Sequence, residues 1–339
     1  MLTRFTKARR DWITALPFIS PLVVWLIALV AYPFAASLYW SFCSYDLLSS
    51  PRWIGGANYR ALGSELGAGV GFGKALWNSC YYALFSVPLS IVLGISLAIM
   101  LSWQVRGRAV YRAALFLPSV VPVVATALLW MWLLDPQAGL VNHLIRAPLE
   151  AGAGMIDAPA PATPGWFHSP KEAGNPRDWL ASGEDEGSAA WTLPFGSKDG
   201  LILMHLWGVG NFMIIYLAAL GDAPRSLHEA AQLDGASAIA RFRHITLPLL
   251  TPVIFFNLVL GLIQSLQSFT PAYLVSDGEG SPAGATLTLS LHMFLSAFKE
   301  LRMGYAAAMA WALCLFTIVA TALLFRHSRR WVFYQGGRP

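Results

Sequence analysis

The chain has 339 residues, of which 56% are hydrophobic and only 12% charged, with a formal net charge of +5. Soluble domains average about 25% charged residues, so this composition excludes an ordinary soluble protein and indicates a membrane protein. The arginines concentrate in short segments between apolar runs, so the net charge reflects topology and lipid contact and argues against nucleic-acid binding.

Six stretches without a charged residue are each long enough to cross a bilayer, because about 20 helical residues span the hydrocarbon core. They are residues 12–45, 75–105, 113–134, 200–221, 244–276 and 303–325. Each holds one spanning helix but not comfortably two, so the sequence predicts an all-α membrane protein with six transmembrane helices. The first stretch contains three prolines and lacks a suitable small-residue cleavage site, so we expect it to be retained rather than cleaved as a signal.

The distribution of Lys and Arg predicts the orientation of these helices. If the N-terminus is cytoplasmic, the cytoplasmic segments hold 14 of the 23 basic residues, whereas the opposite side holds 14 of the 18 acidic residues. Basic residues concentrate in short cytoplasmic segments. We therefore expect a cytoplasmic N-terminus (1–11), a transmembrane domain (12–326) and a cytoplasmic C-terminal tail (327–339).

Two outer loops have unusual composition. Residues 67–74 read GAGVGFGK, which lacks the spacing of a phosphate-binding loop, and we expect a flexible lead into the second span rather than a helix-dimerisation face. The long loop 135–199 is rich in Pro, Gly and acids and is predicted to be mostly irregular, with Trp166, Trp179 and Trp191 as docking points. It is either a platform for a soluble partner or a tolerated insertion.

The segment between the fourth and fifth spans, residues 222–248, carries the most specific pattern. Glu229-Ala230-Ala231 is followed after three residues by Gly235 and, after nine further residues, by Ile245-Thr246-Leu247-Pro248. Pro224 should end the preceding helix, and Ser226 with Glu229 has the spacing of a capping box that starts a new helix at Leu227. Gly235 should end that helix in the left-handed conformation.

Residues 236–244 should then form a second short helix that leads into the fifth span. The alanines and Gly235 allow another protein surface to approach closely. A helix lying on the lipid surface would instead need one basic face and one bulky apolar face. The segment is therefore interpreted as a docking surface for a protein partner.

The Glu-Ala-Ala pattern resembles that of permease subunits of binding-protein-dependent ABC importers of the sugar type. The chain is similar to the larger maltose permease subunit and to glycerol-phosphate permeases in several further stretches: Leu16–Pro21, Trp53–Tyr59, Leu115–Pro118, Trp166–Pro170 and Gly304–Ala306. The chain departs from the family by extra residues between Pro170 and Leu201. The resemblance implies a type I ABC importer permease fold, multi-pass in the bacterial cytoplasmic (inner) membrane, with both termini cytoplasmic.

The resemblance also implies the partners: a second homologous permease subunit, an ABC ATPase dimer and an extracytoplasmic solute-binding protein. The residues that couple to the ATPase would be Glu229, Ala230, Ala231, Asp234, Gly235 and Ala236. The chain has no ATP-binding motif, so we expect no enzymatic activity, metal or cofactor on this chain, with ATP and Mg bound by the partner ATPase.

By the same resemblance, the substrate-binding residues would be Trp207, Gly208, Asn211, Gly261, Gln264, Ser265 and Ser268. Amide and hydroxyl groups beside an indole suit a neutral sugar or polyol, and the i, i+4 spacing places Gln264 and Ser268 on one helical face. Polar residues also hold helices together within membranes, so both interpretations stay open.

The alternative is an ion-coupled secondary transporter, which would carry carboxylates or histidines within its spans. The six stretches contain no Asp, Glu, Lys or Arg, and His205 is the one titratable candidate well inside them. A lone histidine is more often a packing or pore residue than a proton relay. An intramembrane enzyme would need a paired acid, a metal cluster or an activated nucleophile, and the sequence offers none, since Cys43, Cys80 and Cys314 have no paired spacing.

Overall fold

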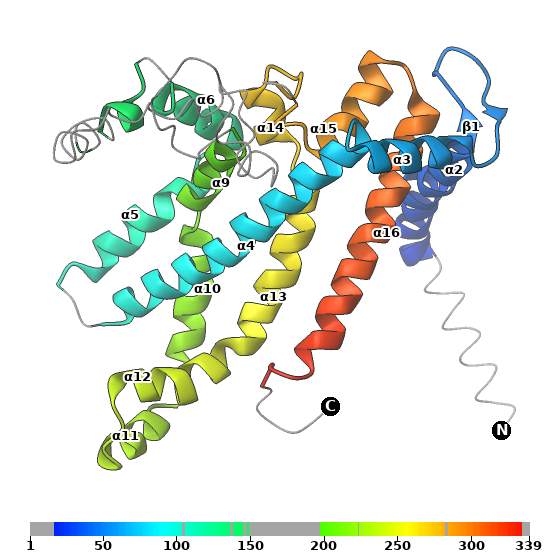
Figure 1. The fold of residues 1–339 in the computed structure, drawn as a ribbon. Helices are drawn as coiled ribbons and strands as arrows, with labels where there is room; N and C mark the ends of the chain where they lie inside the picture. Colours follow the sequence, from blue (N-terminus) through cyan, green and yellow to red (C-terminus); the bar gives the residue numbers. More distant parts are fainter. Residues whose placement is uncertain are drawn as a thin grey trace, which may run out of the picture. The chain divides into compact units, whose positions relative to one another are not determined.

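A computed structural model of the chain describes residues 17–103, 106–135, 138–144, 148, 197–222, 224–281 and 284–333. These residues are mostly helical (Figure 1), with one antiparallel pair of short strands, β1 (Cys43–Ser44) and β2 (Arg52–Trp53). Most of the long loop predicted at 135–199, including its three tryptophans, lies outside the described residues. The chain divides into two compact units, 1–64 with 296–313 and 65–295 with 314–339.

The smaller unit contains a continuous apolar helix, Pro17–Ser41, which includes η1 (Ile27–Ala31) and α2 (Tyr32–Ser41). The π turn η1 directly precedes Pro33, whose ring does not fit a regular helical turn. Asn58, in the first turn of α3 (Ala57–Ala68), donates to the carbonyls of Ser41 at 2.9 Å and Cys43 at 3.0 Å. These bonds tie the end of the helix to β1.

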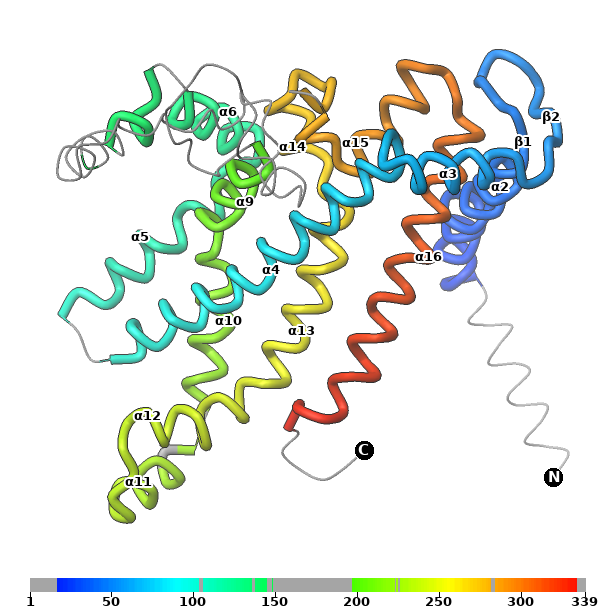
Figure 2. The backbone as a smooth tube through the Cα atoms, in the orientation of Figure 1, coloured from blue at the N-terminus to red at the C-terminus, as the bar shows by residue number. Residues whose placement is uncertain are grey.

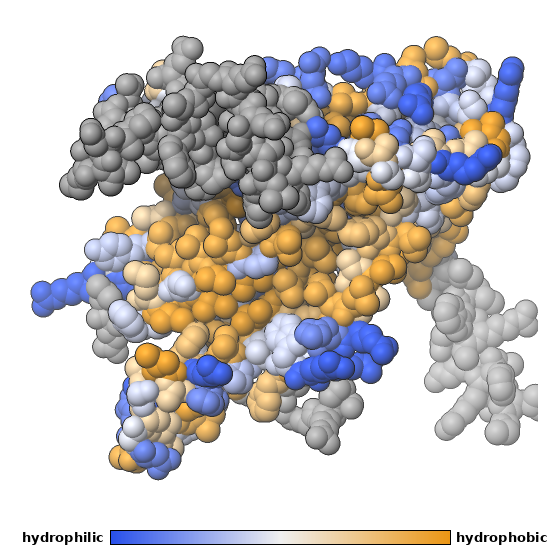
Figure 3. Space-filling view, in the orientation of Figure 1, coloured by the Kyte–Doolittle hydropathy of each residue, from blue (hydrophilic) through white to orange (hydrophobic). Residues whose placement is uncertain are grey.

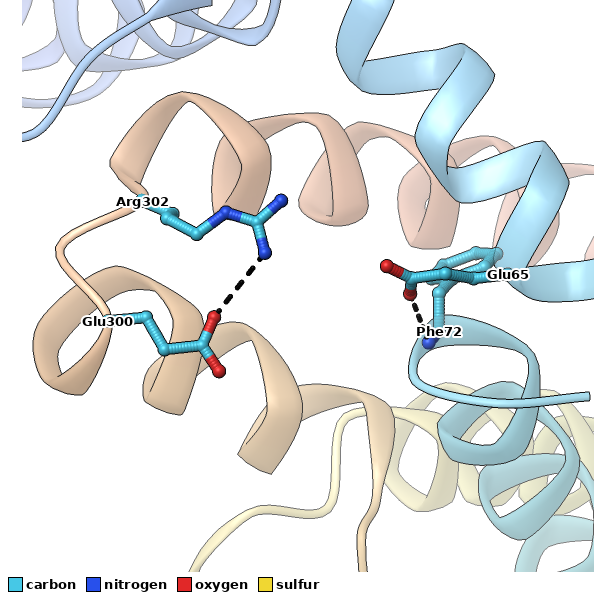
Figure 4. A network of polar contacts seen from close by, with 4 residues as sticks. All are labelled: Glu65, Phe72, Glu300 and Arg302. Carbon is cyan, nitrogen blue, oxygen red and sulfur yellow. Dashed lines mark hydrogen bonds and ion pairs between the residues drawn. The ribbon is translucent and has the colours of Figure 1, made fainter.

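Two charged residues precede α16 (Met303–Ser328), the last helix, which crosses the division between the units. They follow the π turn η4 (Leu295–Lys299). Arg302 pairs with Glu300 at 3.6 Å (Figure 4), and its guanidinium lies 4.2 Å from the centre of the Tyr305 ring. Both charged side chains are exposed, so the pair contributes little stability.

The larger unit has a core of three helices, α4 (Phe72–Ser102), α10 (Gly210–Gly221) and α13 (Leu247–Leu266). Its buried residues are Val87, Ile91, Ala98, Leu101, Met213 and Tyr216. Among the residues that the structure describes, Tyr216 Oη and Nδ2 of the buried Asn257 in α13 have no hydrogen-bond partner. The face in Figure 3 is apolar over these three helices.

A second cluster joins α4 to three shorter helices, α6 (Val123–Leu133), α9 (Ser197–Trp207) and α14 (Thr270–Val275). Its buried residues include Tyr82, Trp130, Leu134, Leu201, Met204 and Val275. At the start of α9, Tyr81 donates a hydrogen bond to the Asp199 carboxylate at 3.0 Å. A short helix, α15 (Leu289–Phe294), packs against α4, where Asn78 donates to the carbonyls of Gly284 and Leu287.

Within the described residues, four continuous helices are long and apolar enough to cross a membrane: Pro17–Ser41, Phe72–Ser102, Ala238–Leu266 and Met303–Ser328. Two further pairs of helices pass the same test only when taken together. They are α5 (Arg108–Val120) with α6, bent by 98°, and α9 with α10, bent by 45°. Six stretches are thus accounted for only if each bent pair forms one span.

The bends lie where two of the six predicted stretches were expected to be single helices. Pro122 has no N–H, and Val121 before it is extended (φ −67°, ψ 131°), so the helix stops and restarts. In the other pair, the N–H groups of Gly208 and Val209 donate hydrogen bonds to the carbonyls three residues earlier, at 3.1 Å each. These bonds interrupt the i to i−4 pattern of the α-helix. The stretch 244–276 also differs from a single helix, because it contains α13 and the separate α14.

Within the glycine-rich stretch 67–74, residues 69–71 form a tight turn between α3 and α4. The Glu65 carboxylate accepts the Phe72 N–H at 2.7 Å (Figure 4), which satisfies a free donor at the start of α4. Gly69 and Gly71 both have positive φ, so these glycines are needed for the turn itself.

Candidate functional site

The connection between α10 and α13 forms two short helices, α11 (Arg225–Leu233) and α12 (Ala238–Arg241), beyond the end of α10 (Figures 1 and 2). Pro224, in an extended conformation, is the N-cap of α11, and its carbonyl accepts the Leu227 N–H at 3.3 Å. The helix therefore begins two residues before the predicted start at Leu227. The predicted capping box is wrong, because Ser226 lies inside the first turn and α11 has no side-chain cap.

Gly235 ends α11 in the left-handed conformation, with φ +77°, which confirms the prediction for this residue. The Gly235 N–H bonds the Gln232 carbonyl at 3.0 Å and the Ala236 N–H bonds the Ala231 carbonyl at 2.9 Å. These two bonds form a Schellman motif, which satisfies carbonyls left free at the helix end. The turn conformation is therefore set by a few adjacent residues.

Ser237 starts the second helix, because its Oγ accepts the Ala240 N–H at 3.2 Å. The helix predicted at 236–244 thus begins at Ala238, and it does not end before the fifth stretch. Through the π turn η3 (Phe242–Thr246), α12 continues into α13 as one helix, Ala238–Leu266. A displacement of α12 would therefore act directly on α13.

We call α11, α12 and the turn between them the hairpin. The residues predicted to couple to an ATPase lie at its surface. Four are exposed and two half-buried: Glu229, Ala230, Asp234 and Gly235 in the first group, Ala231 and Ala236 in the second. A Cβ on Gly235 would meet no atom within 4 Å. Beside the turn, Leu233 is 91% exposed and Ile239 is 79% exposed.

The sequence reasoning missed Leu233 and Ile239, although their positions on either side of Gly235 were a usable signal. Neighbouring exposed apolar side chains often mark a protein contact. The hairpin thus presents small residues, two exposed acidic residues and two exposed apolar side chains.

The predicted substrate residues lie on or next to α10 and α13, two helices that pack on each other and on α4. Trp207 and Gly208 lie at the bend between α9 and α10, and Asn211 is exposed in the first turn of α10. On α13, Gln264 is exposed. The structure therefore brings the two groups onto neighbouring elements, with the amides of Asn211 and Gln264 accessible.

The other three positions on or after α13 make contacts within the chain. Gly261 lies against α4, where an added Cβ would be 2.9 Å from Val87 Cγ1, and the buried Ser265 donates to the Leu262 carbonyl at 3.0 Å. The prediction that Gln264 and Ser268 share a helical face is wrong, because α13 ends at Leu266. Pro271 has no N–H to continue the helical bonding to Gln267.

An aromatic cluster that the sequence did not reveal lies beside these residues. The ring of the buried Tyr82 of α4 meets the His205 ring edge-on, with ring centres 5.9 Å apart. The Ser268 carbonyl accepts a hydrogen bond from Thr288 Oγ1 at 2.9 Å. Trp130 of α6 similarly meets Trp207 edge-on at 6.3 Å. His205 therefore has an aromatic packing partner, and nothing in the sequence marked Tyr82 or Trp130 among the aromatic residues of the spans.

In the part of the chain that the structure describes, no group of three or more His, Cys, Asp or Glu could hold a metal ion.

The chain matches known proteins in sequence and in fold. Residues 90–332 match the family described as "Binding-protein-dependent transport system inner membrane component". The chain is 36% identical to the probable ABC transporter permease protein YesP of Bacillus subtilis (strain 168), over 96% of this chain and 94% of that protein. It is 29% identical to the sulfoquinovosyl glycerol transport system permease protein SmoG of Agrobacterium fabrum, over 93% of this chain and 90% of that protein.

Among solved structures, the chain resembles one in a bacterial alginate ABC transporter in complex with its alginate pentasaccharide-bound periplasmic protein. The TM-score is 0.71 at 20% identity, covering 96% of this chain and 97% of that one, so the two share a fold. The family consists of transporter components rather than enzymes, and an ion-coupled secondary transporter is not favoured. The resemblance seen in the sequence is confirmed: the chain belongs to the family of binding-protein-dependent transport system inner membrane components, as a sugar-type ABC importer permease.

Proposed function

We propose that this permease forms half of the translocation pathway of an ATP-driven importer for a carbohydrate or related polyol. The α11–α12 hairpin is its coupling element, and it docks on a separate ABC ATPase dimer. The other partners are a second homologous permease and an extracytoplasmic solute-binding protein. ATP and Mg bind to the ATPase, and this chain holds no cofactor.

The observation that carries the proposal is the geometry of the hairpin. Its turn is fixed by the Schellman motif at Gly235, its surface is open above that glycine, and α12 is continuous with α13. Leu233 and Ile239 supply apolar area for a protein contact, and the exposed Glu229 and Asp234 suit a basic rim on the partner. A continuous helix of this kind connects the hairpin directly to the membrane domain.

In the proposed topology, each of the two bent pairs counts as one span, which gives six spans with both termini in the cytoplasm. Residues 1–11 and 327–339 are then cytoplasmic and residues 12–326 form the transmembrane domain. The hairpin within 222–248 lies inside and the long loop 135–199 outside. The helix bends near Pro122 and Gly208 support a translocation pathway beside these residues. Broken helices in membranes occur where the backbone lines a cavity or is buried in protein.

The cargo class rests on the relatives and on the accessible polar groups. SmoG is named for sulfoquinovosyl glycerol and the structural neighbour for alginate. In this chain, the exposed amides of Asn211 and Gln264 supply donors and acceptors for hydroxyl groups, and Trp207 supplies an aromatic surface. Gly208, Gly261, Ser265 and Ser268 complete the proposed substrate region by shaping the helices around it.

The coupling role is tested by Gly235→Asn in the assembled complex. Asn adopts the left-handed conformation more readily than most residues, and the chain leaves open space for it, so the hairpin should keep its fold. We expect normal membrane insertion with transport abolished and ATPase co-purification reduced, because the side chain occupies the docking surface.

The matched control is Gly55→Asn. Gly55 also has a positive φ, +60°, and nothing within 4 Å of its Cβ position, but it lies in the loop after β2. The Gly55→Asn variant should leave ATPase co-purification unchanged. Full transport and full ATPase recovery with Gly235→Asn would show that the hairpin is not the docking element.

The topology is tested by single cysteines in place of Ser182 and Ser237, in a background without Cys43, Cys80 and Cys314. An impermeant thiol reagent added to whole cells should label the Ser182→Cys protein, and the Ser237→Cys protein only after the membrane is opened. Labelling of both from outside would contradict the six-span topology.

The substrate region is tested by Asn211→Ala and Gln264→Ala. One lost hydrogen bond should raise the concentration for half-maximal uptake about 2- to 10-fold in each variant, with ATPase co-purification unchanged. Ser265→Ala is the control, because its hydroxyl bonds its own helix. Unaltered uptake affinity and substrate preference in both amide variants would place the substrate elsewhere.

A further inference from the structure

The residues after α16 turn back onto the first turns of α13. The Ser328 carbonyl accepts the N–H groups of Trp331 at 3.0 Å and Val332 at 2.9 Å, which closes a turn at the end of the helix. The Phe333 N–H then donates to Thr251 Oγ1 at 2.9 Å, across 82 residues of sequence. We call residues 329–333 the C-terminal strap.

Thr251 lies at a gap in the hydrogen bonding of α13. Pro252 has no N–H, so the Pro248 carbonyl lacks the helical donor four residues later. The Thr251 hydroxyl donates to that carbonyl at 2.7 Å while it accepts the Phe333 N–H. One hydroxyl therefore closes the gap in α13 and also joins α13 to the strap.

Aromatic packing reinforces this junction one turn later. Phe255 is buried and meets Phe325 of α16 edge-on, with ring centres 4.9 Å apart. It also meets Trp331 of the strap edge-on at 6.1 Å. Thr251 and Phe255 are four residues apart and so lie on one face of α13, which the strap and the C-terminal end of α16 cover.

The junction lies next to the least regular part of the long helix Ala238–Leu266. The π turn η3 comes first, and Pro248 and Pro252 follow within two turns. π turns and prolines are where helices bend most readily. If this part bent freely, it would absorb a displacement of the hairpin before that displacement reached the body of α13.

We propose that the C-terminal strap is a positioning device that makes the start of α13 and the C-terminal end of α16 move together, so that hairpin displacement reaches the pathway. Thr251 and Phe255 are its attachment points. The inference rests on the coupling role proposed for the hairpin, and it predicts a defect in transmission without a defect in ATPase docking.

Two matched pairs of variants test the hydrogen bond. Thr251→Val removes the hydroxyl, whereas Thr251→Ser keeps it. Phe333→Pro removes the donor N–H, whereas Phe333→Ala keeps that N–H and removes only a half-exposed side chain. Each is assembled with its second permease, ATPase and solute-binding protein in liposomes, where both cargo uptake and ATP hydrolysis are measured.

We expect Thr251→Val and Phe333→Pro to lower the number of cargo molecules moved per ATP about 2- to 10-fold, the range for one lost hydrogen bond. Thr251→Ser and Phe333→Ala should stay near the wild-type ratio. The combination of Thr251→Val with Phe333→Pro should be little worse than Thr251→Val alone, because Thr251→Val already removes the bond that Phe333→Pro removes. ATPase co-purification should be unchanged in all of them.

These outcomes separate the strap from the coupling role. If Thr251→Val and Phe333→Pro assemble with the ATPase and keep the wild-type ratio, the strap proposal is overturned while the hairpin proposal stands. If Gly235→Asn leaves ATPase docking and transport intact, the hairpin proposal fails whatever the strap variants do. Should Thr251→Val fail to assemble, Phe333→Pro carries the test, because it leaves the α13 sequence unchanged.

A cross-link tests whether the two elements move together. In a background without the native cysteines, Thr251→Cys with Phe333→Cys should form a disulfide on oxidation. The oxidised complex should move more cargo per ATP than the reduced one, because the bond replaces the lost attachment. A block of transport by oxidation, reversed by reduction, would mean that the strap must leave α13 and would overturn the proposal.

Discussion

Gly235 and Gly210 lie 25 residues apart, and each position favours glycine for a different reason. At Gly235 the backbone is left-handed and the space around it is empty. At Gly210, an added Cβ would lie 2.8 Å from Phe116 Cα, so α10 packs directly on the backbone of α5. The first glycine serves a local turn on an exposed hairpin, and the second serves the packing of two helices.

This contrast shows how differently the two regions are specified. The hairpin depends on a few adjacent residues and keeps its surface free for a partner. The helical core depends on small residues wherever helices approach, as at Gly94, whose Cβ would lie 2.9 Å from Phe212 Cβ. Substitutions should therefore damage docking in the first region and folding in the second.

The largest effect is expected from Gly210→Ala. The added Cβ meets backbone atoms of Leu115 and Phe116, which cannot rotate away, so we expect destabilisation of about 1–3 kcal/mol or more. Thermal unfolding in detergent and the monodisperse fraction measure it. Gly221→Ala on the same helix is the control, since its Cβ would meet nothing within 4 Å. Equal stability of the two variants would contradict the close packing of α10 on α5.

A smaller effect is expected from Gly261→Ala. Here the Cβ would meet the Val87 side chain at 2.9 Å, and a side chain can shift where a backbone cannot. Thermal stability should fall less than in Gly210→Ala. Combining Gly261→Ala with Val87→Ala should cost less than the sum of the two single changes, because the smaller side chain makes room.

The same variants distinguish packing from substrate contact at Gly261. A change in cargo preference with unchanged thermal stability would favour direct contact with the cargo. Lower stability, rescued by Val87→Ala with unchanged preference, would favour packing.

The smallest effect is expected from Ser237→Ala in the hairpin. Loss of the bond from Ser237 Oγ to the Ala240 N–H should cost about 1 kcal/mol of local helix stability. Hydrogen exchange over residues 238–243 should become faster. Ser226→Ala should leave exchange in α11 almost unchanged, because that serine does not cap its helix. If hydrogen exchange became equally faster in both variants, Ser226 would cap α11 as the sequence predicted, and the N-cap seen in the structure would be contradicted.

The sequence by itself determined the membrane class, the six apolar stretches, the family and the left-handed turn at Gly235. Each depends on composition or on neighbouring residues: uncharged runs follow from the cost of placing charges in lipid, and the turn follows from glycine tolerating positive φ. The start of α11 was predicted two residues late for a local reason also, since Pro224 and Ser226 compete as helix starts and the proline is the N-cap.

The tertiary structure decided which helices touch and therefore what their polar residues do. Ser265 bonds its own helix and Gly261 packs on Val87, whereas the Tyr82 ring packs against His205 from a separate helix. The bond between Thr251 and Phe333 joins residues 82 positions apart. No local pattern encodes such contacts, because they depend on how far each helix runs, where it bends and which neighbour it meets, and those are set by the packing of the whole bundle.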